Sequence, residues 1–154
     1  MTRFQNKIVL ITGAGSGIGR STALRLDKEG ATSIIVDMNA EQLTETHLML
    51  SNPESTLRVL DISSLDDAKK CFQEIKETHN QLDALINVAG ILRFDNSHEV
   101  EISNWNKILE VNLTGTFFMC NFGLPMLLES KGCIVNVSST AALGSHAWTA
   151  AYSA

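Results

Sequence analysis

Thr12-Gly-Ala-Gly-Ser-Gly-Ile-Gly19 is the stretch of sequence that decides the fold. It follows a nearly unbroken apolar run at residues 7–12, which is typical of a strand buried on both faces of a parallel sheet. A helical pattern over residues 18–29 comes next, and Gly30 ends it. Glycines between a strand and a helix let the backbone approach a pyrophosphate, and the helix N-terminus presents unpaired N–H groups to it. The spacing T-G-x-x-x-G-x-G therefore predicts a nucleotide-binding turn that includes Gly13, Ser16, Gly17, Ile18 and Gly19.

Strand-like and helical segments alternate along the rest of the chain. Apolar runs predict further strands at 33–37, 56–60, 82–88 and 133–137, and helical patterns occupy about 40–50, 64–79 and 103–129. Such alternation builds a parallel sheet with helices on both faces, and right-handed crossovers give the strand order 3-2-1-4-5. The sequence thus predicts an α/β fold, a three-layer doubly wound Rossmann-type sheet in a single domain over residues 1–154. Its ligand crevice is expected beyond the carboxyl ends of strands 1 and 4.

Asp37 ends the predicted second strand, 18 residues after Gly19. A carboxylate in this place can accept hydrogen bonds from both hydroxyls of an adenosine ribose, and it repels a 2′-phosphate. We find no arginine or lysine beside Asp37 in the sequence that would reverse the preference. An aspartate that only caps the next turn is the alternative interpretation. The pattern favours NAD over NADP as the cofactor.

Composition excludes several classes of function. The 17 acidic and 12 basic residues give a net charge of −5, and the basic residues are scattered, so we expect no nucleic acid partner. The most apolar segment, 117–128, is interrupted by Asn121, Gly123 and Pro125, so we expect no membrane span, and no signal peptide is recognisable. Neither the three cysteines nor the four histidines have metal-ligand spacing. We therefore expect no metal, and reduced thiols in a cytoplasmic protein.

Five further features, taken in chain order with the glycine turn and Asp37, resemble the short-chain dehydrogenase/reductase family of the NAD-preferring type. They are Asp61-Ile62 after strand 3, Asn87-Val-Ala-Gly90 after strand 4, Asn112 in the long helix, Ser138-Ser139 after strand 5, and Tyr152. Any one of them could arise by chance, but the ordered set is specific and spans nearly the whole chain. The resemblance implies hydride transfer between NAD(H) and a secondary alcohol or ketone.

The resemblance also implies roles on the cofactor side of the site. Asp61 would meet the adenine amino group, and the Ile62 backbone would lie beside the ring. Asn87 would brace strand 4, with Ala89 and Gly90 beneath the cofactor. Here the family's usual Asn-Asn-Ala-Gly reads Asn-Val-Ala-Gly, so any contact from a second asparagine side chain is missing.

On the catalytic side, the resemblance implies that Asn112 holds a water in a proton relay. Ser139 would orient the substrate oxygen, and Tyr152 would pass it a proton. We choose Ser139 over Ser138 because it precedes the tyrosine by 13 residues, close to the family's usual spacing. Strand alternation, which places Ser139 on the face of Val137 and turns Ser138 away, supports the choice.

One departure from the family pattern affects the expected activity. Relatives carry a lysine four residues after the tyrosine, and this sequence ends at Ala154, two residues before that position. We therefore expect the 154 residues to be part of a longer chain that forms a homo-oligomer, and to have negligible turnover alone. A non-catalytic NAD-binding or regulatory module is the alternative function. A methyltransferase on a similar fold is disfavoured by the ordered pair Ser139 and Tyr152.

Overall fold

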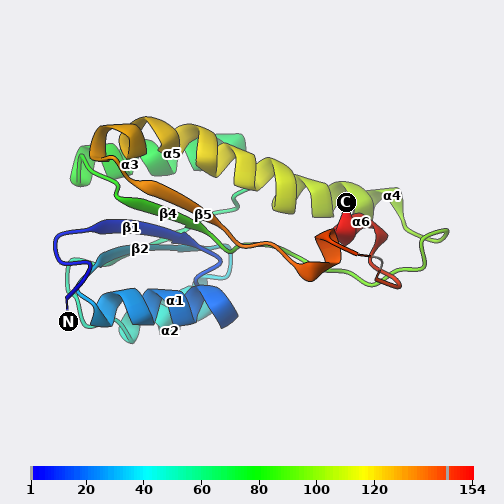
Figure 1. Ribbon diagram of the computed structural model, residues 1–154, viewed down its shortest axis with the longest axis horizontal. Helices are drawn as coiled ribbons and strands as arrows, with labels where there is room; N and C mark the ends of the chain where they lie inside the picture. Colours follow the sequence, from blue (N-terminus) through cyan, green and yellow to red (C-terminus); the bar gives the residue numbers. More distant parts are fainter. Residues whose placement is uncertain (1, 145) are drawn as a thin grey trace.

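Five parallel strands form one sheet in the order β3-β2-β1-β4-β5, which confirms the predicted topology. The computed structural model describes residues 2–144 and 146–154, and Figure 1 shows the sheet between two layers of helices. Each predicted strand is present within two residues of its expected bounds. The strands are β1 (Ile8–Thr12), β2 (Thr32–Asp37), β3 (Thr56–Val59), β4 (Ala84–Asn87) and β5 (Cys133–Asn136).

The central strands are buried on both faces, as their apolar runs predict. In β1, Val9 and Ile11 point to one helical layer, whereas Leu10 points to the other, and all three side chains are at most 1% exposed. The edge strand β5 is different, because Cys133 and Val135 are exposed. The core therefore centres on β1 and β2.

Two helices cover one face of the sheet, and the remaining long helices cover the other (Figure 1). On the first face lie α1 (Gly17–Lys28) and α2 (Ala40–Leu48), and on the second lie α3 (Leu65–Thr78), η1 (Glu110–Gly115) and α5 (Thr116–Ser130). The helix α4 (Ile102–Leu109) extends beyond the end of the sheet. Side chains cap α2 and α3 at their N-termini. Asn39 accepts a hydrogen bond from the Gln42 N–H at the start of α2, and Ser64 caps α3 by accepting from the Asp67 N–H.

The elements α4, η1 and α5 form one continuous helix, which has π-helical geometry over η1. It confirms the long helix predicted at about 103–129, and it continues through Asn121, Gly123 and Pro125. By length and composition alone, this helix could cross a membrane. In the fold, however, Met119, Met126 and Leu127 are buried in the core beneath it. We therefore interpret the helix as one layer of the domain core.

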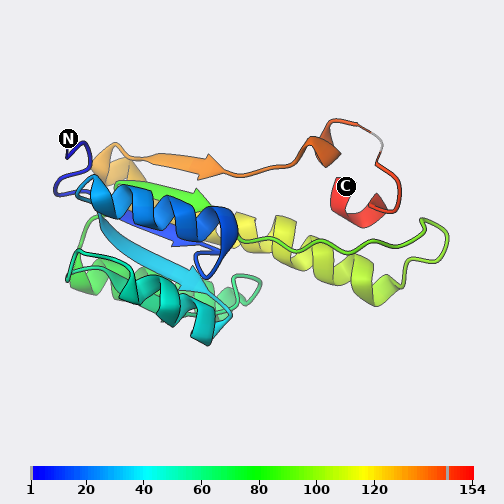
Figure 2. The same ribbon diagram turned by 90° about the horizontal axis from the view of Figure 1, so that it is seen from below.

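The last two short helices, η2 (Thr140–Ala142) and α6 (Ala150–Ser153), lie beyond the carboxyl ends of the strands (Figure 2). A backbone hydrogen bond from the Asp95 N–H to the Trp148 carbonyl, 2.9 Å long, ties the segment before α6 to the segment after β4. An isolated bridge between Asp95 and Thr149 strengthens the same connection. These contacts bring the end of the chain to the edge where the sheet's crevice lies.

Candidate active site

The glycine turn has the tight backbone that the sequence predicts. Gly13 and Gly17 have φ angles of 66° and 52°, a region that side-chain-bearing residues rarely adopt. A Cβ on Gly13 would lie 2.7 Å from the Ala89 nitrogen, so only glycine allows β1 and β4 to meet there. Ser16, the N-cap of α1, makes no side-chain capping bond. The first N–H groups of this 12-residue helix therefore have no partner from the cap, which suits an anionic group.

Thr12 fixes the segment after β4 to the start of the turn. Its side chain is fully buried, and its hydroxyl oxygen accepts hydrogen bonds from the N–H groups of Val88 at 3.1 Å and Ala89 at 3.2 Å. The sequence predicts no role for Thr12 beyond its place in the glycine pattern. The only sequence signal for this contact is a threonine directly before the first glycine.

Asp37 lies at the end of β2, next to the glycine turn. One carboxylate oxygen accepts a hydrogen bond from the Gly15 N–H, and the other accepts one from the Asn39 N–H, each 2.9 Å long. Arg20, on α1, also bonds to Gly15, but it forms its ion pair with Glu45. Arg20 donates a hydrogen bond to the Gly15 carbonyl, whereas Asp37 accepts one from the Gly15 N–H.

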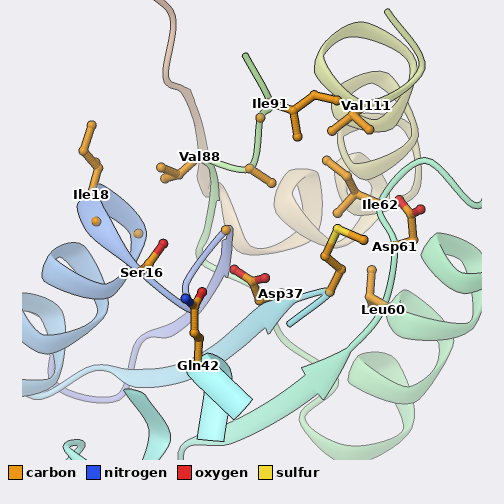
Figure 3. Close-up of a pocket in the computed structure, with 16 residues that line it drawn as sticks. Ser16, Ile18, Asp37, Gln42, Leu60, Asp61, Ile62, Val88, Ile91 and Val111 are labelled. Carbon is orange, nitrogen blue, oxygen red and sulfur yellow. The ribbon is translucent and has the colours of Figure 1, made fainter. Parts of the chain in front are cut away.

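A cleft with a volume of about 390 Å³ opens in front of the turn, and we call it the glycine-turn lobe. Figure 3 shows Asp37 and Asp61 reaching it from the ends of neighbouring strands. Ten of the eleven predicted cofactor residues line it; only Asn87 does not. The lining residues are Gly13, Ser16, Gly17, Ile18, Gly19, Asp37, Met38, Gln42, Leu60, Asp61, Ile62, Val88, Ala89, Gly90, Ile91 and Val111.

Asp61 is held in the glycine-turn lobe by Ser63 and Lys107, two residues whose roles the sequence does not predict. One carboxylate oxygen accepts from the Ser63 N–H at 2.9 Å and from the Ser63 hydroxyl at 2.6 Å. The other lies 3.5 Å from the ammonium of Lys107, on α4. Burial alone would raise the pKa of the Asp61 carboxyl, but the Ser63 hydrogen bonds and the Lys107 charge outweigh it and hold the pKa below its ordinary value. Asp61 therefore stays ionised at neutral pH.

Asn87 lies beneath the cleft rather than on its wall, and it is 4% exposed. Its side-chain NH₂ donates to the Asn136 side-chain oxygen at 2.8 Å and to the Cys120 sulfur at 3.3 Å. Asn87 and Asn136 are register partners on β4 and β5, so this bond joins the ends of the two strands. Within residues 2–144 and 146–154, the buried Oδ1 of Asn87 has no hydrogen-bond partner.

A second cleft, with a volume of about 440 Å³, adjoins the first, and we call it the serine–tyrosine lobe. It contains all three predicted catalytic residues. The lining residues are Ile18, Val88, Ala89, Gly90, Ile91, Leu92, Asn112, Thr116, Val137, Ser138, Ser139, Ala142 and Tyr152. Five of them, Ile18, Val88, Ala89, Gly90 and Ile91, also line the glycine-turn lobe. The two lobes therefore form one continuous cleft at the predicted crevice.

The two serines after β5 are not separated as strand alternation predicts. Ser138 and Ser139 both line the serine–tyrosine lobe, because β5 ends at Asn136 and the regular pleat does not continue into the serines. Ser139 is the N-cap of η2, and its hydroxyl oxygen accepts from the Ala141 N–H at 3.2 Å. Tyr152, half-buried on α6, lines the same lobe.

Uncharged groups line the serine–tyrosine lobe throughout the part of the chain that the structure describes. Arg93, in the segment after β4, is not among the lining residues. In the same described residues, no three His, Cys, Asp or Glu side chains gather as a metal site would require. The cleft thus combines an acidic, glycine-rich lobe with a neutral lobe that carries hydroxyl and amide groups.

Comparisons with known proteins agree with this arrangement. The family model described as short chain dehydrogenase matches residues 7–154. Meso-2,3-butanediol dehydrogenase of Serratia marcescens is 37% identical over 97% of this chain and 59% of its own length. The 3beta-hydroxysteroid dehydrogenase of Mediterraneibacter gnavus is 38% identical over 99% of this chain and 56% of its own length. The chain thus spans under two thirds of the length of these relatives.

Solved structures show the same fold. The crystal structure of NAD+-bound xylitol dehydrogenase matches with a TM-score of 0.94 at 29% identity, covering 98% of this chain and 60% of that one. That of levodione reductase matches with a TM-score of 0.93 at 28% identity, covering 98% and 61%. The fold and cleft define a Rossmann-type α/β protein. Taken with the family match, they show that this chain belongs to the short-chain dehydrogenases.

Proposed function

We propose that the protein is an NAD(H)-dependent oxidoreductase that interconverts a secondary alcohol and a ketone. One observation carries the proposal: the lobe that contains Asp37 and the lobe that contains Ser139 and Tyr152 share the backbone of Ala89 and Gly90. A dinucleotide that lay across this shared floor would have its adenosine end at Asp37 and its reactive end beside the two hydroxyls. The names of the relatives, which are alcohol and hydroxysteroid dehydrogenases, support the same class of reaction.

The residues of the glycine-turn lobe fit such a cofactor. A Cβ on Gly17 would meet no atom within 4 Å, so the turn is open towards the cleft where a pyrophosphate would approach α1. Asp37 would accept hydrogen bonds from the ribose hydroxyls and disfavour a 2′-phosphate. Asp61 and Ile62 would bound the adenine. The NAD+-bound state of the related xylitol dehydrogenase supports the choice of NAD over NADP.

In the serine–tyrosine lobe, the chain's own residues would position the substrate oxygen and move its proton. The bound nicotinamide supplies or accepts the hydride. Ser139 would donate a hydrogen bond to the substrate oxygen, where negative charge develops during reduction. Tyr152 would deliver a proton to the same oxygen in reduction and receive it in oxidation. Asn112 would connect the site to water through a proton relay.

Further properties of the whole protein follow as parts of the proposal. We propose one NAD-binding domain over residues 1–154, a cytoplasmic location, and a homo-oligomer. The free state of all three cysteines supports a reducing compartment. Exposed apolar side chains along one side of the long helix support self-association; they are Leu113, Phe117, Leu124 and Leu128.

Titration with both cofactors, followed by a turnover assay, tests the function. NADH fluorescence should show binding much tighter than that of NADPH, and a panel of secondary alcohols should show NAD reduction by the full protein. Equal affinity for the two cofactors would refute the role of Asp37. Tight NADH binding without turnover on any secondary alcohol or ketone would instead favour a non-catalytic NAD-binding module.

A further inference from the structure

Arg20, in the first turns of α1, binds the glycine turn to α2 through one guanidinium group. Its Nε donates to the Thr46 hydroxyl at 2.8 Å, and its Nη2 donates to the Gln42 carbonyl at 3.1 Å. Nη2 also forms an ion pair with Glu45 at 3.0 Å and donates to the Gly15 carbonyl. The Arg20 side chain is 24% exposed, so most of it is enclosed by these partners. Three of the four partners lie on α2.

Gly15 links Arg20 to Asp37 through its two backbone polar groups. On one side, the Gly15 carbonyl accepts from Arg20. On the other, the Gly15 N–H donates to the Asp37 carboxylate at 2.9 Å. A Cβ on Gly15 would lie 2.8 Å from the same carboxylate oxygen, which shows how closely the turn and Asp37 approach. The position of the Asp37 carboxylate therefore depends on a backbone segment that Arg20 holds.

The Arg20 charge is itself kept away from the cleft. Arg20 is not among the residues that line the glycine-turn lobe, and the Glu45 carboxylate pairs with its guanidinium. An arginine free to reach the adenosine ribose would attract a 2′-phosphate and favour NADP. Here Arg20 bonds to the carbonyl of Gly15, whereas Asp37 accepts from its N–H.

We propose that Arg20 is a positioning residue for cofactor choice. It holds Gly15 and α2 so that the Asp37 carboxylate faces the adenosine ribose of NAD, while its own charge stays paired with Glu45. This inference rests on the proposed NAD-binding function. A planar guanidinium with several N–H donors suits the task, because one group bonds to two carbonyls, a hydroxyl and a carboxylate at once. Without it, Asp37 loses both its fixed distance to the ribose and part of its repulsion of a 2′-phosphate.

The test compares Arg20→Met, Arg20→Lys and Arg25→Met in the full protein, each titrated with NADH and NADPH at one salt concentration. Arg25 is the matched control, because it lies on the same helix and pairs with Glu29, away from the cleft. Loss of the charge-assisted hydrogen bonds predicts that Arg20→Met raises the Kd for NADH about tenfold. The Kd for NADPH should rise less, so the Kd for NADPH divided by the Kd for NADH should fall. The ratio in Arg20→Lys should lie between those of the wild type and Arg20→Met. Arg25→Met should keep the wild-type ratio.

The ratio distinguishes a positioning role from a general loosening of the turn. If Arg20→Met weakens both cofactors by the same factor, or weakens neither, the inference is overturned. A wild-type protein that binds neither cofactor would refute the proposed function itself. Should Arg20→Met fail to fold, Glu45→Gln keeps the arginine and unpairs its charge. That variant should bind NADPH more tightly than wild type does, and unchanged NADPH affinity would count against the inference.

Discussion

Asn112 holds the backbone of Ile91 with both ends of its side-chain amide. Its Oδ1 accepts from the Ile91 N–H at 2.8 Å, and its Nδ2 donates to the Ile91 carbonyl at 2.9 Å. The two residues are 21 positions apart, and Asn112 lies within the π-helical segment of the long helix. Because Ile91 lines both lobes of the cleft, this pair of bonds fixes part of the wall that the lobes share.

Replacing Asn112 with leucine should therefore lower stability as well as activity. Both polar groups of Ile91 would lose their partner in a partly buried place, and we expect the free energy of unfolding to fall by about 2 kcal/mol. Urea unfolding would measure the change. Thr116→Val serves as the control, because it removes only a hydroxyl that donates to the Asn112 carbonyl. If Asn112→Leu lost turnover at unchanged stability, the residue would act through the water relay alone.

Two glycines of the turn should respond very differently to alanine. A Cβ on Gly19 would overlap the Gly13 carbonyl, a backbone group that cannot move aside, whereas a Cβ on Gly17 would meet no atom. We expect Gly19→Ala to abolish NADH binding and to cost several kcal/mol of stability. Gly17→Ala should cost about 1 kcal/mol, because its φ of 52° is unfavourable for alanine. Urea unfolding and NADH titration of both variants check this, and similar losses in the two would contradict it.

The sheet and its glycine turn were predictable because their signals are local. The unbroken apolar run before Gly13, the glycine spacing and Asp37 at the next strand end all lie within one strand–helix–strand unit. Strand order then followed from the general handedness of crossovers. The Ser64 cap was predictable for the same reason, since it bonds to a residue three positions away.

The contacts that hold the site in place were not predictable, because they join residues distant in sequence. Arg20 contacts Thr46, which is 26 positions away, and Lys107 contacts Asp61, which is 46 positions away. Thr12 contacts Ala89, which is 77 positions away. Arginine, lysine and threonine at such positions are equally compatible with a solvated surface or a strand interior. The exposure of Ser138 to the cleft was missed for a local reason, namely that β5 ends before the alternation could apply.

The catalytic assignment separates into three substitutions. Tyr152→Phe should abolish turnover in the full protein, because the ring remains while its transferable proton is lost, and NADH binding should change little. Ser139→Ala should lower the rate by about 10²–10³-fold, as expected for one donor to a developing oxyanion. Ser138→Ala is the matched control, since Ser138 lines the same lobe and is expected to have a much smaller effect. Near-normal kcat in Tyr152→Phe would assign the proton transfer to another group.

The three cysteines should react with alkylating reagents at distinct rates. Burial raises the pKa of the Cys71 thiol to about 12, so little of the reactive thiolate is present at neutral pH. Cys133 is exposed on the edge strand, and Cys120 is partly buried. Mass spectrometry after brief iodoacetamide treatment should find Cys133 modified and Cys71 unmodified, and unfolding in urea should remove the difference. Rapid labelling of Cys71 in the folded protein would show that the α3 side of the core opens readily.

Stability at acidic pH should depend on Glu29, at the end of α1. The Arg3 guanidinium, which donates to this carboxylate at 2.8 Å through Nη2, and then that of Arg25 lower the pKa of Glu29 to about 2 from its ordinary 4.5. Because the folded pKa is the lower one, the ionised carboxylate stabilises the fold above pH 4.5, and this contribution is lost as the pH falls towards 2. Urea midpoints measured from pH 6 down to about 2 should therefore fall less steeply in Glu29→Gln than in the wild type. Glu77→Gln, on the exposed side of α3, should follow the wild-type curve. Parallel curves for the wild type and Glu29→Gln between pH 4.5 and 2 would mean that the two arginines do not hold the carboxylate in solution.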